Sequence, residues 1–203
     1  GKDGKLFGSV THKDIAELLV PFVKPNQIIV LNPGRTCGAI EIRKVFEDYG
    51  IDKNIIIAEA QSLIYACRIS GPAEVRIIGA KEKVLLASLP AIHTQQVCEK
   101  LNSIYACFVP AENVLVTSLE NIGAVFHPSV VLFNAATIER GQSFYFYNDM
   151  TPSIAKFLEN LDKERLAIGK AFGYNLVPAI EWISLAYSNI KGDTLCDKMK
   201  NNP

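Results

Sequence analysis

The chain has 203 residues, 49% of them hydrophobic, and its 21 basic and 21 acidic side chains give a formal net charge of zero. This length and hydrophobicity suffice for one large domain or two small ones, each with its own core, and they exclude a disordered chain. Because positive charge is neither in excess nor clustered, the sequence lacks the electrostatic footprint of a nucleic-acid-binding protein.

The sequence also argues against membrane and metal partners. No apolar run reaches the length of a membrane span, and Gly1–Lys5 is not followed by the apolar core of a signal peptide, so we expect a soluble cytoplasmic protein. Three scattered histidines have no ligand spacing, which argues against a metal site. The five cysteines are odd in number and form no Cys-x-x-Cys pair, which argues against a disulfide framework or a zinc site.

The first half of the chain alternates between helical and strand patterns. His12–Val23 has apolar residues at helical spacing, and Ile28–Leu31 is a short, unbroken, β-branched run typical of a buried strand. A second helix, capped by Thr36 and ending at Tyr49, precedes a second apolar strand, Ile55–Ala58. This order predicts an α/β sheet. The apolar positions expected to face the core in the first helix are Ile15, Leu18, Leu19 and Phe22.

Shorter strands follow this pattern. Cys67–Ser70, Glu74–Ile78 and Lys83–Leu89 are separated by turn residues, and we expect them to add to the sheet edge in a mixed or antiparallel way. Thr94–Tyr105 then predicts a helix packed on that sheet.

From Asn113 onward the patterns are helical, except for a candidate strand at Phe144–Tyr147. The change of pattern places a domain boundary near Pro110, so that residues 1–110 form an α/β domain and residues 111–203 an all-helical one. The predicted helices are Asn113–Ala124, Val130–Glu139, Thr151–Phe172 with Thr151 as its cap, Pro178–Tyr187 and Thr194–Met199.

Four residues directly after the predicted strands are candidates for binding a cofactor. Pro33, Gly34, Arg35 and Glu59 would lie at the carboxyl ends of strands, where open α/β sheets bind ligands. Gly34 would let a ligand approach the backbone, and the next helix would offer free amides to an anion. Alternatively, Pro33 and Gly34 form only a turn, and Glu59 pairs with Arg35 or Arg68. Because no G-x-G-x-x-G fingerprint occurs, these residues belong to the later half of a dinucleotide-binding domain, or the cofactor hypothesis fails.

The stretch Asn-Ile-Gly-Ala-Val-Phe-His-Pro, from Asn121 to Pro128, holds the candidate catalytic residue. A histidine with an ordinary pKa of about 6.5 suits proton transfer near neutrality; the alternative is that His127 is a structural residue near a helix break. Asn121 lies six residues earlier, too far round an ideal helix to stack on His127, so their contact would need a break at Pro128. The other histidines, His12 and His93, look like local helix caps.

Five stretches in a fixed order resemble the octopine/nopaline (opine) dehydrogenase family: Ile29–Thr36, Ala58–Leu63, Tyr65–Arg68, Asn113–Leu115 and Asn121–Pro128. The resemblance covers the chain from about Thr11 to Pro203. It implies the later half of a Rossmann-type NAD(P)-binding domain, followed by a helical domain like the C-terminal domain of 6-phosphogluconate dehydrogenase.

The resemblance also implies a function. Members of the family use NAD or NADP to join the amine of an amino acid to a 2-oxo acid, an oxidoreductase reaction at a CH–NH bond. The family's catalytic histidine falls on His127, and Asn121 is then expected to bind substrate. The family's glycine-rich loop would precede residue 1, and its substrate-binding arginine with a Glu-Asp pair would follow Pro203. We therefore expect this chain to be an internal portion that is inactive alone.

Two alternatives stay open from the sequence. One is another two-domain reductase of 2-oxo or 2-hydroxy acids, similar to ketopantoate reductase, which needs no amino acid. The other is a non-catalytic helical assembly module with a degenerate cofactor domain. A homodimer also stays open, because large helical domains often dimerise.

Overall fold

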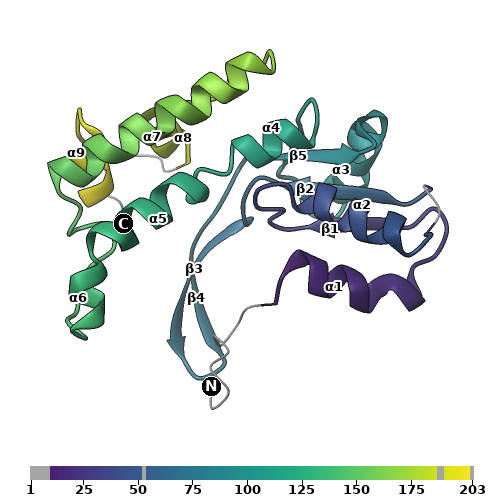
Figure 1. The fold of residues 1–203 in the computed structure, drawn as a ribbon, viewed down its shortest axis with the longest axis horizontal. Coiled ribbons are helices and arrows are strands. Elements are labelled where there is room, and N and C mark those ends of the chain that lie inside the picture. The colour runs from purple at the N-terminus through teal and green to yellow at the C-terminus, as the bar shows by residue number, and fades with distance from the viewer. Residues whose placement is uncertain (1–9, 52–53, 187–189, 202–203) are drawn as a thin grey trace. The chain divides into compact units, whose positions relative to one another are not determined.

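The computed structural model describes residues 10–51, 54–186 and 190–201 (Figure 1). The chain divides into two compact units, Gly1–Ser118 and Leu119–Pro203, which are described separately below. This division falls at the end of helix α4 (Val114–Leu119), whereas the change of sequence pattern placed the boundary near Pro110.

A four-stranded mixed sheet forms the centre of the first unit. Its strands, in spatial order, are β1 (Ile28–Leu31), β2 (Ile56–Ala60), β5 (Val84–Leu89) and β6 (Phe108–Pro110). The pairs β1–β2 and β5–β6 are parallel, and β2–β5 is antiparallel. The predicted α/β arrangement is confirmed, but β5 lies inside the sheet and not at its edge. Strand β6 was not among the predicted strands, because a three-residue strand that ends in proline leaves almost no periodic signal.

Helices cover both faces of this sheet. Alternate residues of β2 enter two separate cores: Ile57 packs with the core that contains α2 (Gly38–Asp48), and Ala58 packs with the core that contains α3 (Thr94–Asn102). This is the expected consequence of the two-residue period of a strand. The first unit is therefore a layered α/β fold, as predicted.

The first helix, α1 (His12–Leu19), faces the core differently from the prediction. Its buried residue is Ala16, while Ile15, Leu18 and Phe22 of the following 3-10 turn are 43%, 68% and 71% exposed. The small Ala16 lies at the helix surface that packs with Ala39 and Ile42 of α2. The prediction was correct only for Leu19, which packs partly buried against this core.

Two strands lie outside the main sheet. β3 (Tyr65–Gly71) and β4 (Glu74–Ala80) pair only with each other in a two-stranded antiparallel sheet (Figure 1). Ala73, in the turn between them, has a left-handed φ of 60°. The prediction that these strands extend the main sheet was wrong, because alternation within a strand does not specify its partner.

The second unit is helical, as predicted. Its described residues contain no strand, and Phe144–Tyr147 forms irregular and turn structure. Completely or almost completely buried residues from four helices and one loop form its core: Val130, Met150, Leu158, Ile183 and Leu195. The described residues of the second unit form α5 (Gly123–Phe133), α6 (Ala135–Glu139), α7 (Pro152–Ala171), α8 (Ala179–Ala186) and α9 (Leu195–Lys200), of which α6 contributes no residue to this core. The predicted helix end at Tyr187 lies outside the described residues.

By length and composition alone, the segment Val114–Phe133 is long and apolar enough to cross a membrane, but half of its most apolar stretch is buried inside the structure. It comprises α4 and α5, because the helix is interrupted between Leu119 and Gly123. The interruption contains Glu120, which is only 4% exposed. These features are those of core helices in a globular fold.

The cap of α7 allows a direct test of helix stability. The Thr151 side chain accepts a hydrogen bond from the Ile154 N–H at 3.3 Å, as predicted. We expect Thr151→Ala to lower the free energy of unfolding by about 1 kcal/mol, because this amide loses its acceptor. Urea denaturation measures the change, with Thr151→Ser as the control that keeps the oxygen. An equal loss in both variants would contradict the capping role.

Candidate functional site

The loop after β1 is fixed to the end of β2. Pro33, Gly34 and Arg35 follow β1 directly, as predicted, and the Gly34 N–H donates to the Ala60 carbonyl at 2.9 Å. Arg35 and Cys37 both adopt left-handed backbone conformations, with φ of 58° and 62°. Such conformations in residues other than glycine cost free energy and are frequent at functional sites. The Arg35 side chain is exposed.

Glu59 is completely buried at the end of β2, and it binds three donors. Its carboxylate accepts from the Ala39 N–H at 2.9 Å and from the hydroxyls of Thr117 at 2.6 Å and Ser118 at 2.9 Å. The negative charge thus lies at the N-terminus of α2, where the helix dipole stabilises it. The alternative that Glu59 pairs with Arg35 or Arg68 is wrong: no ion pair to Glu59 occurs among the described residues.

The N-terminus of α2 is less open to an anion than the sequence suggested. Cys37, and not Thr36, occupies the N-cap position, and its N–H donates to the Ser118 hydroxyl at 2.9 Å. Together with the bond from Ala39 to Glu59, this leaves two amides of the helix start already paired within the protein. The predicted cap at Thr36 was therefore wrong, and the group that accepts from the amide of the N-cap residue lies 81 residues later in the sequence, where no local pattern reveals it.

Gly34 has a packing reason to be glycine. A Cβ at this position would lie 2.3 Å from the Glu59 Cβ, far inside van der Waals contact. The position that a side chain of residue 34 would occupy therefore faces Glu59 and not an open surface. Cofactor binding by Pro33, Gly34, Arg35 and Glu59 stays a prediction, but the buried carboxylate of Glu59 is placed to support the loop and not to contact a ligand from outside.

The side chains of His127 and Asn121 both lie beside Gly123. A Cβ on Gly123 would lie 3.3 Å from the Asn121 Oδ1, and 3.7 and 3.8 Å from the His127 Cε1 and Nδ1. Pro128 does not break the helix, because it lies inside α5. The break comes before Gly123, which leaves Asn121 outside the helix and lets its side chain lie near the first turn. The expected helix break at Pro128 was therefore wrong.

A small pocket of about 70 Å³ adjoins His127. Three of its lining side chains carry polar groups: His127, Tyr147 and the indole of Trp182. The His127 ring also packs edge-on against Phe146, with ring centroids 5.3 Å apart. An imidazole beside an apolar pocket is an arrangement that can exchange a proton with a partly desolvated ligand. The pocket is lined by Ile122, Gly123, Phe126, His127, Tyr147, Trp182, Ile183 and Met199.

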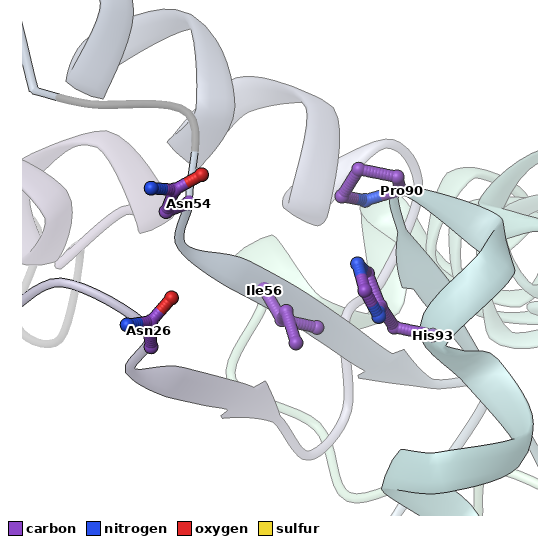
Figure 2. A pocket seen from close by; sticks show the side chains of 5 residues that line it. All are labelled: Asn26, Asn54, Ile56, Pro90 and His93. Carbon is purple, nitrogen blue, oxygen red and sulfur yellow. The ribbon is translucent and has the colours of Figure 1, made fainter.

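A larger pocket of about 300 Å³ lies at the other end of the parallel strands, near the start of β1 and β2. Figure 2 shows Asn26 and Asn54 on one side of Ile56, with Pro90 and His93 on the other. Ligands of open α/β sheets bind at the carboxyl ends of the strands, so this pocket is not at the expected cofactor edge.

The two remaining histidines do not cap helices with their side chains. Thr11 caps α1 through a capping box with Asp14, and the His12 Nδ1 lies 4.0 Å from the Glu41 carboxylate. His93 occupies the N-cap position of α3 but makes no side-chain capping bond. Both predictions of a histidine cap were therefore wrong.

The second unit contains a buried charged cluster that was not predicted from the sequence. Glu120, Asp162 and Arg165 are all 7% exposed or less. The Arg165 Nε donates to the Asp162 Oδ1 at 2.8 Å, and the Arg165 Nη1 lies 3.8 Å from the Glu120 Oε2. The only sequence signal was the spacing of three between Asp162 and Arg165, which is equally typical of an exposed helical ion pair.

Glu120 gives this cluster a pH dependence. Burial raises the pKa of its carboxyl above the ordinary 4.5, and the Val177 N–H and the Arg165 charge oppose the shift only in part. The folded chain thus binds this proton more tightly than the unfolded chain. The stability contributed by protonated Glu120 is present at acid pH and is lost as the pH rises from 4.5 through the folded-state pKa.

We therefore expect Glu120→Gln to stabilise the protein increasingly as the pH rises from acid to neutral. Glutamine keeps an oxygen acceptor for the Val177 N–H, which donates to the Glu120 Oε1 at 2.8 Å, and it has no charge to desolvate. Urea denaturation of both proteins at several pH values from about 4.5 to 7 measures the difference. A difference that is constant over this range would contradict the shifted pKa.

Comparison with known proteins agrees with the resemblance seen in the sequence. Residues 110–203 match the alpha-helical domain of the NAD/NADP octopine/nopaline dehydrogenases. The chain is 36% identical over 196 residues to an opine dehydrogenase of Arthrobacter sp. (strain 1C), an alignment that covers 96% of this chain and 54% of that protein. The chain thus spans about half the length of this relative.

Solved structures show the same fold. Octopine dehydrogenase in complex with NADH and agmatine has a TM-score of 0.71 at 18% identity, over 94% of this chain and 51% of that one. Yersinopine dehydrogenase bound to NADP+ gives 0.69 at 13% identity, over 90% and 48%.

A reductase outside the opine group shares the fold more distantly. The 2-dehydropantoate 2-reductase of Methylococcus capsulatus gives a TM-score of 0.54 at 17% identity, over 98% of this chain and 55% of that one. The fold is therefore the later half of a Rossmann-type domain joined to a helical domain. The comparisons thus agree on one family: residues 110–203 match the alpha-helical domain of the NAD/NADP octopine/nopaline (opine) dehydrogenases, and almost the whole chain is similar to part of an opine dehydrogenase.

Proposed function

We propose that the full-length gene product is an NAD(P)H-dependent opine dehydrogenase, which joins an amino acid to a 2-oxo acid by reduction at a CH–NH bond. The observation that carries this proposal is the approach of His127 and Asn121 to Gly123 beside an apolar pocket, within a helical domain that matches this family. The Arthrobacter relative is named as an opine dehydrogenase, and octopine dehydrogenase has been solved with NADH and with L-arginine.

The described residues fit one part of a dinucleotide site. Exposed Arg35 and the backbone of Pro33 and Gly34 lie at the carboxyl end of β1, where such a ligand binds. The start of α2 does not fit a pyrophosphate, because two of its backbone N–H groups already donate hydrogen bonds to Glu59 and Ser118. Arg35 and this loop would hold the cofactor, and NAD(P)H would supply the hydride.

In the proposed reaction, the amine of the amino acid attacks the carbonyl carbon of the 2-oxo acid. Loss of water then gives an imine. The imine carbon accepts the hydride, and the nitrogen takes up a proton to give the secondary amine. His127 would donate a proton to the departing hydroxyl and take one from the amine, since an imidazole changes its protonation state near neutrality. Asn121 would hydrogen-bond the substrate, because its Oδ1 lies beside the same face of Gly123.

An assay of NAD(P)H oxidation by the full-length gene product tests the proposal. We expect oxidation that requires both a 2-oxo acid and an amino acid, with a secondary-amine product detected by mass spectrometry. Oxidation by the 2-oxo acid alone would instead favour the ketopantoate reductase-like alternative, which the shared fold with 2-dehydropantoate 2-reductase supports. Absence of oxidation under every condition would favour the non-catalytic assembly module.

The cytoplasmic location and the homodimer stay proposals as well. The proposed binding partners are small-molecule substrates, and we propose that the protein binds neither nucleic acid nor a membrane. Light scattering during gel filtration of the full-length gene product measures its oligomeric state.

A further inference from the structure

Arg165 binds two separate backbone segments of the second unit at once. Its Nη1 donates to the Leu119 carbonyl at 2.9 Å, and its Nη2 donates to the Val177 carbonyl. Its Nε donates to the Asp162 carboxylate one turn earlier on α7. The guanidinium is 7% exposed, so these bonds form in a desolvated environment where each is stronger than in water.

The two acids of the cluster also bind the second of these segments. Glu120, next to Leu119, accepts from the Val177 N–H through its Oε1 at 2.8 Å. Asp162 accepts from the Ala179 N–H through its Oδ2 at 2.8 Å. The stretch from Val177 to Ala179 is therefore held from three sides, and it is held to the corner between α4 and α5.

Each of these segments leads directly into a wall of the pocket at His127. After Glu120 the chain continues through Ile122 and Gly123, and both of these residues line the pocket. After Ala179 it continues along α8 to Trp182 and Ile183, which also line it. Fixing the distance between the two segments therefore fixes the distance between the two walls.

We propose that Arg165 is a positioning residue for the site at His127: with Asp162 and Glu120, it fixes the start of α5 relative to the start of α8. This inference rests on the proposed role of His127. Stability alone does not explain the cluster, because buried ion pairs are often replaceable by apolar side chains without loss of stability. The Glu120 Oε2, which has no hydrogen-bond donor among the described groups, shows that the charges of this cluster are not optimally paired.

Arg165→Lys and Arg165→Met in the full-length gene product test the proposal. Lysine keeps the charge but cannot donate in three directions from one plane, and methionine keeps the length without any donor. We expect kcat/KM to fall by about tenfold or more in both variants, because small displacements of a reacting group are costly, while the Kd for NAD(P)H is unchanged. Lys163→Met is the matched control: Lys163 is exposed on the same helix, and the substitution removes the same charge.

Trp182 gives a readout that does not depend on activity. Proteins labelled with 5-fluorotryptophan show the resonance of this residue by fluorine NMR, and Trp182→Phe assigns it. We expect the Arg165 variants to shift or broaden the Trp182 resonance under conditions in which they are fully folded. Lys163→Met should leave the resonance in place.

The outcomes separate this inference from the proposed function. A lower midpoint of unfolding with the Trp182 resonance and kcat/KM of the folded protein unchanged would overturn the positioning role and leave the role of His127 intact. If Arg165→Met does not fold, Arg165→Lys and Asp162→Asn decide the question by the same criteria. If the wild-type protein makes no opine, the proposed function fails, and the resonance alone then decides whether Arg165 fixes the pocket walls.

Discussion

Replacement of His127 by alanine in the full-length gene product is expected to lower kcat for opine formation by about a hundredfold or more, which is the usual contribution of a general acid or base. The Kd for NAD(P)H should be nearly unchanged, since the candidate cofactor residues lie in the other unit. The substitution removes the imidazole beside the pocket of Ile122, Phe126 and Trp182 but leaves their packing in place. Steady-state kinetics and a cofactor titration measure the two quantities.

His93→Ala is the matched control for this prediction. It removes a histidine from the first unit, where His93 lines the larger pocket at the amino ends of β1 and β2 (Figure 2). We expect kcat to be unaffected by it. A His127→Ala enzyme that keeps on the order of a third of wild-type turnover would contradict the assignment, because an acid–base residue contributes far more than threefold.

The parts of the fold that the sequence predicted correctly are those set by local patterns. Ile28–Leu31 forms the predicted strand, since an unbroken β-branched run bounded by turn residues has few other structures open to it. Thr151 caps α7 as predicted, because a cap depends on residues three positions apart. The helical character of the second unit follows in the same way from apolar residues at helical spacing.

The features that the sequence did not predict depend on contacts between distant residues. Glu59 binds Thr117 and Ser118, which are 58 and 59 residues later, so no local pattern reveals that this acid supports a loop. Arg165 likewise binds Leu119, 46 residues earlier. On a helical wheel the same residue is indistinguishable from an exposed member of an ion pair.

The candidate site shows both cases together. The motif was found from the order of its residues, but its geometry depends on where α5 begins. The sequence placed the helix break at Pro128, whereas the helix runs through Pro128 and starts at Gly123. A proline within an apolar segment is a strong local signal for a break, and burial of Val125, Phe126 and Val130 against the core of the second unit outweighs it here.

Gly34→Ala is expected to lower the free energy of unfolding of the first unit by about 3 kcal/mol, at the upper end of the usual cost of overpacking. The added methyl group would lie 2.3 Å from the Glu59 Cβ and 2.8 Å from its Oε2. The Cβ is attached to the backbone of β2, so the clash cannot be relieved by rotating a side chain. Urea denaturation of the full-length gene product, followed by circular dichroism, measures the loss.

Gly79→Ala is the control, because a Cβ at Gly79 in β4 meets no atom within 4 Å. We expect it to change stability by no more than about 0.5 kcal/mol. A similarly small change in Gly34→Ala would contradict the packing explanation. Relief of the clash requires the loop after β1 to move away from Glu59, which would weaken the hydrogen bond from Ala39 to Glu59 and the one from Cys37 to Ser118. The proposed cofactor contacts of Arg35 depend on the same loop, so the Kd for NAD(P)H should rise in Gly34→Ala and stay constant in Gly79→Ala.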